Sequence, residues 1–146
     1  MSTEVDTLAF FDALADEMNT HGERFAPLGE AEMVAVVVMG RPGQDFRVRL
    51  EFESLGCIGV AEVDATAAQL ADFRLEGPLE DWRAMFDDIA ANGRATGPFT
   101  INSLALMGDR ICCTGDDPMG IDKFSRFNQT LQEFFDGARH VAVGTG

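Results

Sequence analysis

One helix near the C-terminus constrains this chain more than any other segment. Asp117 followed by Pro118 is typical of a helix start, because Asp can cap a free N–H and Pro fits the first helical position. Apolar residues then recur at steps of three and four, which places them on one face of a helix from about 118 to 136: Ile121, Phe124, Phe127, Leu131, Phe134 and Phe135. Gly137 follows where a left-handed residue would end the helix. This apolar face must cover either a protein core or an apolar ligand, and periodicity alone leaves both open.

Length and cysteine content predict a single domain over residues 1–146 with neither a disulfide nor a metal. A chain of 146 residues can bury a core without such support. Its three cysteines, Cys57, Cys112 and Cys113, are odd in number and two are adjacent, so we expect reduced thiols in the cytoplasm. No apolar run reaches the roughly 18 residues of a membrane span. The acidic start, Met1 to Asp6, lacks the features of a secretory signal.

The net charge of the chain restricts the kinds of partner that it can bind. The chain has 25 acidic and 11 basic residues, a formal net charge of −14, which argues against nucleic acid and against stable association with anionic membranes. Its aromatic residues are 12 Phe and one Trp without Tyr, accompanied by seven Met. Phe has no polar group, and Met adapts to irregular shapes, so these residues seek wholly apolar surroundings.

Two more amphipathic helices precede the C-terminal one. The first is expected over about 3–21, with Thr3 and Asp6 as a capping box and an apolar stripe made of Leu8, Phe11, Leu14, Ala15 and Met18. The second begins after Gly77-Pro78 and ends at Asn92-Gly93. Its inward face is Leu79, Trp82, Met85, Phe86 and Ile89.

Between the helices, several segments read as strands. Residues 33–39 are short and rich in Val, which predicts a strand buried on both faces. Residues 46–53 alternate apolar with charged side chains, which predicts a strand with one wet face. A turn at 54–56 leads to a third strand over about 57–63, and 73–76 and 110–114 are further strands. Residues 100–107 fit either a strand or a short helix. The sequence therefore predicts an α+β fold with antiparallel hairpins.

Catalytic and metal-binding groups are sparse. His21 and His140 lie near expected surface ends, and adjacent Cys112 and Cys113 would point to opposite faces of a strand, which suits no zinc site. Asp116 and Asp117 are best explained by helix capping. A small cofactor-independent enzyme would need a buried carboxylate with a raised pKa, for which Asp64 and Asp72 are the candidates.

Several polar residues are candidates for binding the head group of a ligand. Arg41, Arg47, Arg49 and Lys123 could meet a carboxylate or phosphate, although Arg47 and Arg49 share the wet face of their strand. Arg126 and Asn128 lie beside the apolar stripe of the C-terminal helix and are the better candidates.

Two segments carry a resemblance to a known family. The strand-to-helix junction Asp72-Phe73-Arg74-Leu75-Glu76-Gly77-Pro78-Leu79-Glu80-Asp81-Trp82 is the first. The second is Ala105-Leu106-Met107 followed by Arg110-Ile111-Cys112-Cys113-Thr114-Gly115-Asp116, a basic-apolar-x-apolar-x-Gly-Asp strand. With the closing apolar helix, this order resembles the sterol carrier protein 2 family over roughly residues 33–137. The chain departs from the family pattern at Leu106, where Phe is common, and at the additional Asp116-Asp117-Pro118.

The resemblance implies a fold and a function. The fold is a five-stranded, mostly antiparallel sheet with N-terminal, central and C-terminal helices covering a hydrophobic tunnel. The function is non-covalent binding and carriage of an apolar ligand such as a fatty acid, an acyl-CoA or a sterol, with no cofactor. The expected ligand-facing residues are Trp82, Met85, Phe86, Leu104, Met107, Phe124, Phe127, Leu131 and Phe135. The acidity favours a soluble carrier, or a protein that hands an apolar substrate to an enzyme. The expected partners are such an enzyme or a second copy in a homodimer. A small enzyme, or a subunit packing on another chain, remains an alternative.

Overall fold

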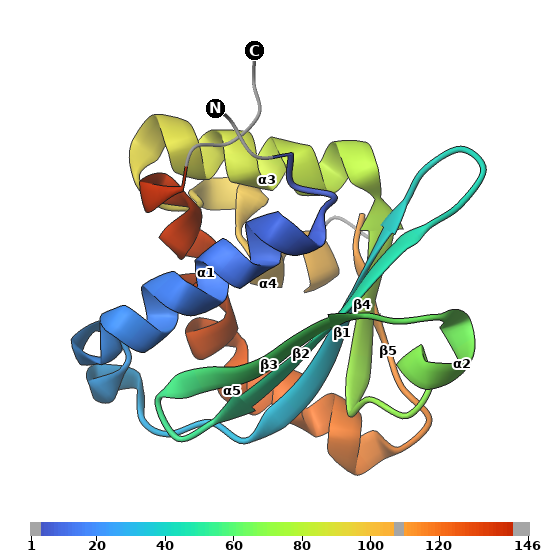
Figure 1. The fold of residues 1–146 in the computed structure, drawn as a ribbon, viewed down its shortest axis with the longest axis horizontal. Coiled ribbons are helices and arrows are strands. Elements are labelled where there is room, and N and C mark those ends of the chain that lie inside the picture. Colours follow the sequence, from blue (N-terminus) through green and yellow to red (C-terminus); the bar gives the residue numbers. More distant parts are fainter. Residues whose placement is uncertain (1–3, 107–109, 142–146) are drawn as a thin grey trace.

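The chain folds around a mixed sheet (Figure 1). The computed structural model describes residues 4–106 and 110–141. Within them the sheet has five strands in the order β3-β2-β1-β4-β5. Only the β1–β4 pair of this described sheet is parallel, while β1–β2, β2–β3 and β4–β5 are antiparallel. The predicted α+β, mostly antiparallel architecture is therefore confirmed. The strands are β1 Met33–Gly40, β2 Phe46–Glu53, β3 Gly56–Glu62, β4 Phe73–Pro78 and β5 Cys112–Thr114.

The two central strands follow their sequence patterns closely. In β2 the side chains alternate between buried and more accessible up to Glu53, as predicted for one wet face. In β1, residues Ala35 to Met39 are all buried, as predicted for a strand covered on both sides. Its inward residues join the main core, whereas Val36 and Val38 form a separate outer cluster with Ala68.

Most helices cover the inner face of the sheet. Figure 1 shows α1 and α3 on one side of the strands and the short α2 on the other. Short 3-10 helices occupy Gly22–Arg24, Ala26–Leu28, Gly97–Phe99 and Gly137–His140. None of the helices in the described part of the chain combines the length and apolar character that a membrane crossing needs. The α-helices are α1 Leu8–Thr20, α2 Ala65–Ala68, α3 Leu79–Asn92, α4 Ile101–Leu106 and α5 Pro118–Asp136.

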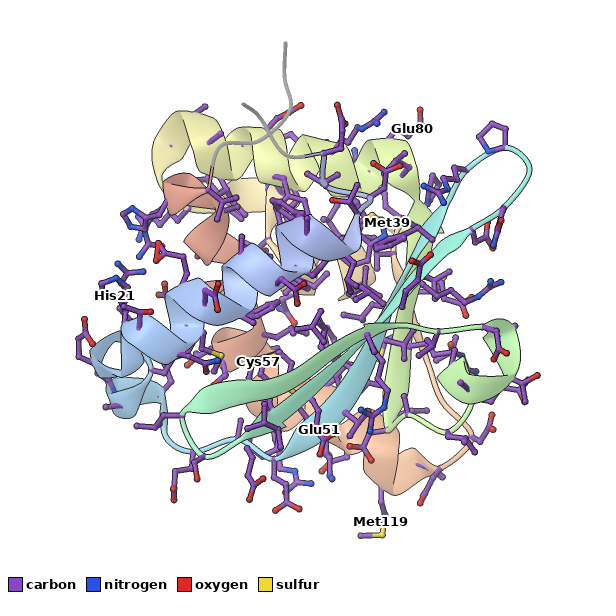
Figure 2. All side chains as sticks on the ribbon, in the orientation of Figure 1. His21, Met39, Glu51, Cys57, Glu80 and Met119 are labelled. Atoms are coloured by element: carbon purple, nitrogen blue, oxygen red, sulfur yellow. The ribbon has the colours of Figure 1, made fainter. Side chains whose placement is uncertain are left out.

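The C-terminal helix agrees with its predicted bounds but not with its predicted end. The Asp117 side chain accepts a hydrogen bond from the Met119 N–H at 2.9 Å, as expected of a cap. Gly137 was expected to be left-handed; instead its φ is −56° and the chain continues into the 3-10 helix Gly137–His140. Inside α5, Phe127 departs from helical geometry with φ −115° and ψ 15°. Met119 projects into solvent from the first turn of this helix (Figure 2).

The first helix starts later than the capping box suggested. Helix α1 begins at Leu8, where the Thr7 hydroxyl accepts a hydrogen bond from the Phe10 N–H at 3.3 Å. Thr3, the expected cap, lies outside the described residues. A Thr one position before the apolar stripe was the better candidate, because the Thr7 hydroxyl also donates to the Glu4 carbonyl at 2.7 Å and holds the preceding turn.

Other differences concern short elements. Of residues 100–107, which fit either a strand or a short helix in sequence, Ile101–Leu106 form α4, and Met107 lies outside the described residues. Strand β4 continues through Gly77-Pro78, which were expected to end it. Helix α2 was not predicted, because four residues are too few to show a helical period; its one signal is Asp64, whose carboxylate accepts from the Ala67 N–H at 2.8 Å.

The start of α5 is pressed against the chain at Asp72. The Asp72 carboxylate accepts hydrogen bonds from the Val34 N–H at 2.8 Å and from Lys123 Nζ at 3.3 Å, so it ties α5 to β1. Gly120 is buried, and a Cβ atom added there would collide with the Asp72 carbonyl oxygen. Glycine at 120 is therefore required by close backbone approach.

We expect Gly120→Ala to destabilise the protein. Alanine favours helices by about 1 kcal/mol over glycine, so a change at an unobstructed helical site would stabilise. At Gly120 the collision should dominate and lower the free energy of unfolding by about 1–2 kcal/mol net, as measured by urea denaturation. Gly22→Ala is the matched control, because nothing lies within 4 Å of its added Cβ. A gain in stability for Gly120→Ala would contradict the close approach.

Candidate functional site

The predicted ligand-facing residues meet in one apolar layer between the sheet and the helices. Most of those in the described ranges are 0–3 % exposed and belong to a single cluster: Trp82, Met85 and Phe86 from α3, Leu104 from α4, and Phe124, Leu131 and Phe135 from α5. Met107 lies outside the described residues. The structure therefore brings together side chains that are up to 53 positions apart in the sequence, from Trp82 to Phe135.

Aromatic rings connect this layer from helix to helix. Phe135 lies edge-on to Trp82, Phe86 and Phe134, with ring centroids 5.8, 5.9 and 5.8 Å apart. Phe86 continues the chain of rings to Phe10 of α1 at 4.9 Å. Such edge-to-face pairs are favourable beyond the area that they bury, by about 0.5–1.5 kcal/mol each.

Trp82 has the single polar group among these rings. Its indole N–H donates to the Val38 carbonyl oxygen at 3.2 Å, so the buried donor is satisfied. This bond joins α3 to β1. Because Trp82 is the only tryptophan in the chain and lies beside Phe135, its fluorescence reports on this layer.

Phe127 differs from the rest of the predicted set. It is only partly buried and lies where α5 loses helical geometry. Its ring borders an open recess of about 360 Å³ together with Glu30, Ala31, Glu32, Glu53 and Ser54. The Arg126 guanidinium lies over the Phe127 ring, 5.3 Å from its centroid.

The two predicted head-group residues lie on the surface side of α5. Arg126 forms an ion pair with Asp122 at 2.9 Å, and both side chains are more than half exposed. The Asn128 amide donates to the Ser125 carbonyl at 2.9 Å. Neither reaches the buried aromatic layer. In the described structure their contacts are local to α5.

A larger open cleft lies at the other end of the sheet. It has a volume of about 590 Å³ and lies where the β1–β2 hairpin, the end of β4 and the start of β5 meet. Arg41 was considered as a ligand group from the sequence, but the cleft itself was not predicted, because its walls come from three segments that show no shared pattern. It is lined by Val38, Gly40, Arg41, Pro42, Asp45, Glu76, Gly77, Pro78, Arg110 and Cys112.

Among residues 4–106 and 110–141, the buried carboxylate is neither of the two that the sequence suggested. Asp64 is exposed and caps α2, and Asp72 binds Val34 and Lys123. Instead, Asp136 is 7 % exposed at the end of α5, where its Oδ1 accepts from the Ala95 N–H at 3.1 Å and from Gln132 Nε2 at 2.9 Å. Burial raises the pKa of its carboxyl from 3.8 to about 6.

Asp136 was missed because it directly follows the apolar stripe at Phe134-Phe135. At that position a polar residue is expected to be the exposed end of the helix. Its contacts indicate a positioning role. Gln132, which donates to Asp136, also accepts from the Ile101 N–H at 2.6 Å. The Asp136–Gln132 pair thus fastens the loop before α4 to α5 through Asp136 Oδ1 and both ends of the Gln132 amide.

Histidine and cysteine residues do not assemble a catalytic group. His21 lies at the C-terminal end of α1 (Figure 2) between Glu17 and Glu23, and His140 is exposed. All three cysteines are free thiols: Cys57 is buried, Cys113 is partly buried and Cys112 is exposed, as predicted for neighbours on one strand. No set of three or more His, Cys, Asp and Glu side chains in the described ranges could hold a metal ion.

Comparison with solved structures identifies the fold. The crystal structure of sterol carrier protein 2 superimposes with a TM-score of 0.68 at 21 % identity, covering 95 % of this chain and 100 % of that chain. The solution structure of a conserved hypothetical protein of Thermus thermophilus, described as possibly a sterol carrier protein, gives 0.69 at 22 % identity, covering 100 % and 96 %. No protein-family model and no curated protein sequence matches the chain. The likeness establishes a sterol carrier protein 2 fold, as the two sequence segments indicated.

Asp136 should make stability depend on pH. Its carboxyl ionises near pH 3.8 in the unfolded chain and near 6 in the folded protein, so between these values the folded state holds the extra proton. Stability from this group is therefore lost as the pH rises from about 4 to 6, by roughly 2 kcal/mol. We expect Asp136→Asn, whose amide oxygen can keep both hydrogen bonds, to be more stable than the parent at pH 7.5 and equal to it at pH 4.

The control for this comparison is Asp87→Asn on the exposed face of α3. It removes the same charge from an acidic protein without touching the buried site. Urea denaturation of both variants at the two pH values separates local burial from general repulsion. An equal gain in Asp136→Asn and Asp87→Asn at pH 7.5 would attribute the effect to net charge alone.

Proposed function

We propose that this protein binds an apolar ligand non-covalently between its helices and the inner face of its sheet, and carries or presents it in the cytoplasm. The ligand class is a fatty acid, an acyl-CoA or a sterol-like molecule. The observation that supports this most is the aromatic layer joined through Phe135, set in a fold shared with sterol carrier protein 2.

The chemistry of the layer suits such a ligand. Apart from the Trp82 indole N–H, which is already bonded to Val38, the side chains proposed to face the ligand offer no polar group. A ligand held there would be recognised by apolar area and shape. Met85 and the nearby Met33, Met39 and Met18 add side chains that can adapt to different apolar shapes.

The acidity of the chain bears on how the ligand is delivered. A net charge of −14 opposes docking on anionic bilayers, so we propose transfer to a partner protein or between copies of this chain rather than stable membrane association. No cofactor is part of this proposal. Exposed apolar side chains on the described surface, such as Ile58, Leu70 and Met119, are isolated single residues that need no special role.

The binding proposal predicts that ligand raises thermal stability. A ligand that binds only the folded state stabilises it by about 2.7 kcal/mol at one hundred times its Kd, which should raise Tm by several degrees. Protein stripped of lipid by solvent extraction and refolding is titrated with a long-chain fatty acid, its CoA ester and a sterol, and the extract is analysed by mass spectrometry. No Tm shift with any of the three, together with an extract free of lipid, would overturn the proposal. Turnover of the extracted lipid would indicate an enzyme instead.

Replacing the partly buried Phe127 should show whether this residue binds ligand or only packs against the core. Leu131→Ala should lower the free energy of unfolding by about 2–5 kcal/mol, as for a buried core residue. Phe127→Ala should cost visibly less because Phe127 already lacks neighbours on one side, and yet it should weaken fatty-acid binding. Affinity is read from Trp82 fluorescence and stability from urea denaturation. Unchanged affinity in Phe127→Ala would remove Phe127 from the proposed site.

A further inference from the structure

The open cleft of about 590 Å³ is separate from the apolar layer. Its Val38 side chain belongs to the outer cluster with Val36 and Ala68, on the face of the sheet opposite the aromatic rings. Figure 1 shows the β1–β2 hairpin extending beyond the start of α3, at the end of the sheet where this cleft is formed. A ligand in the cleft would therefore not occupy the proposed apolar site.

The wall that bears Gly77 is fixed by close backbone packing. A Cβ atom at Gly77 would come within 2.7 Å of the Arg110 carbonyl oxygen and 2.9 Å of Ile111 Cγ1. The Arg110 N–H in turn donates to the Leu104 carbonyl at 3.2 Å. The end of β4 and the segment that bears Arg110 thus form one packed wall, so the backbone of Arg110 is positioned by the fold.

The two carboxylates in the cleft are already paired with arginines outside its lining. Asp45 lies 3.4 Å from Arg47, and Glu76 lies 3.4 Å from Arg74. Their negative charge is therefore compensated locally. The remaining charged groups of the lining are Arg41 and Arg110.

The two lining arginines differ in how they are held. Arg41 is fixed: its Nη1 lies 2.9 Å from Asp6, its Nε donates to the Gln44 carbonyl at 2.7 Å, and its guanidinium stacks over Phe46 at 5.7 Å. Arg110 is exposed and has no ion-pair partner within residues 4–106 and 110–141. Arg41 is thus preorganised but already paired with Asp6, whereas Arg110 has no such partner within the described ranges, and both line the same space.

The rest of the lining is largely apolar. Val38, Pro42 and Pro78 supply aliphatic surface, and Cys112 adds an exposed thiol. The volume is far larger than a bare inorganic anion needs. Guanidinium groups bind carboxylates and phosphates through paired N–H donors, and the apolar surface would contact an attached chain.

We propose that this cleft is a binding site for an amphiphilic organic anion, in which Arg110 and Arg41 hold a carboxylate or phosphate and Val38, Pro42 and Pro78 contact the apolar part. The site does not depend on the ligand proposed for the apolar layer. It accounts for two arginines lining one cleft with a largely apolar surface in a strongly acidic chain.

Cys112 provides a local readout. Burial raises the pKa of both other thiols, Cys57 and Cys113, to about 11, so at pH 8 these two remain protonated and react slowly. Iodoacetamide should therefore modify Cys112, which fragment mass spectrometry distinguishes from Cys113. A molecule in the cleft slows this modification, whereas a molecule in the apolar layer leaves it unchanged.

The experiment measures protection of Cys112 by octanoate and octyl phosphate, with octanol, octylamine and inorganic phosphate as comparisons. We expect both organic anions to protect, and the alcohol, the amine and free phosphate to protect at least about tenfold less strongly, since a charge-assisted hydrogen bond is worth about that factor. The comparison of protection by octanoate with protection by octyl phosphate shows whether the cleft prefers a carboxylate or a phosphate. Protection is expressed relative to the unliganded rate of the same variant, so that any difference in basal reactivity between variants cancels.

Arg110→Gln should weaken protection by octanoate about tenfold. Arg94→Gln, which alters an exposed arginine beyond the end of α3, is the matched control and should change nothing. Arg110 is exposed, so its replacement leaves the fold intact, which the far-UV spectrum and Tm verify. Equal protection by octanol and octanoate, protection by free phosphate as strong as by octanoate, or an Arg110→Gln variant that behaves like the parent would each overturn the proposal. Lipid binding in the apolar layer would be unaffected by any of these results.

Discussion

The fold depends on covering β1 on both faces. On the inner face, Ala35, Val37 and Met39 lie under the layer of rings, in which Phe135 joins α5 to α3 through Trp82 and Phe86. The Trp82–Val38 hydrogen bond adds a directional contact between α3 and the same strand. Burial of this kind is non-directional in itself, so directional contacts are needed to orient the helices on the sheet. The edge-to-face rings and the indole bond orient α3, and the hydrogen bonds of Asn19 with the backbone of Cys57 orient α1.

The closing helix is held at both ends by carboxylates and is irregular between them. Near its start, Asp72 binds both Lys123 and the Val34 N–H, and the absence of a side chain at Gly120 permits close contact. At its end, Asp136 binds the Ala95 N–H from the loop that precedes α4. Phe127, where the helical geometry is lost, lies between these two anchors. The two carboxylates differ in the free energy that their burial costs. Asp72 remains partly exposed, whereas Asp136 is almost fully buried and has a raised pKa.

Much of the fold could be predicted because its periodic elements are long. The alternation in Phe46–Glu53, the apolar run of β1 and the stripe of Pro118–Asp136 each specify both an element and its buried face. The parallel pairing of β1 with β4 could not be read from local pattern, since it depends on a crossover through α2, which is too short to show a period. The buried positions of α3 and α5 were predicted because burial follows helical periodicity, whereas Leu104 lies in a segment whose pattern was ambiguous. The cleft and the buried state of Asp136 were not predicted, because each is assembled from distant segments whose sequences carry no joint signal.

Arginines on the outer face show how a strongly acidic chain can still present a cleft with available positive charge. Arg49–Glu51 and Arg74–Glu76 are each two residues apart on one strand, so their side chains share a face and pair there. Arg47 of β2 pairs in the same way with Asp45, which directly precedes the strand. Arg47 lies opposite Val38, and both Arg49 and Arg74 lie opposite Val36, which places their aliphatic stems beside valines that are 6 % and 0 % exposed. Ion pairs at a protein surface stabilise by only about 0–1 kcal/mol, and the stems of these arginines in addition cover the valines. With these arginines engaged along the strands, the basic side chains that line the cleft within the described chain are Arg110 and Arg41, of which Arg41 is paired with Asp6.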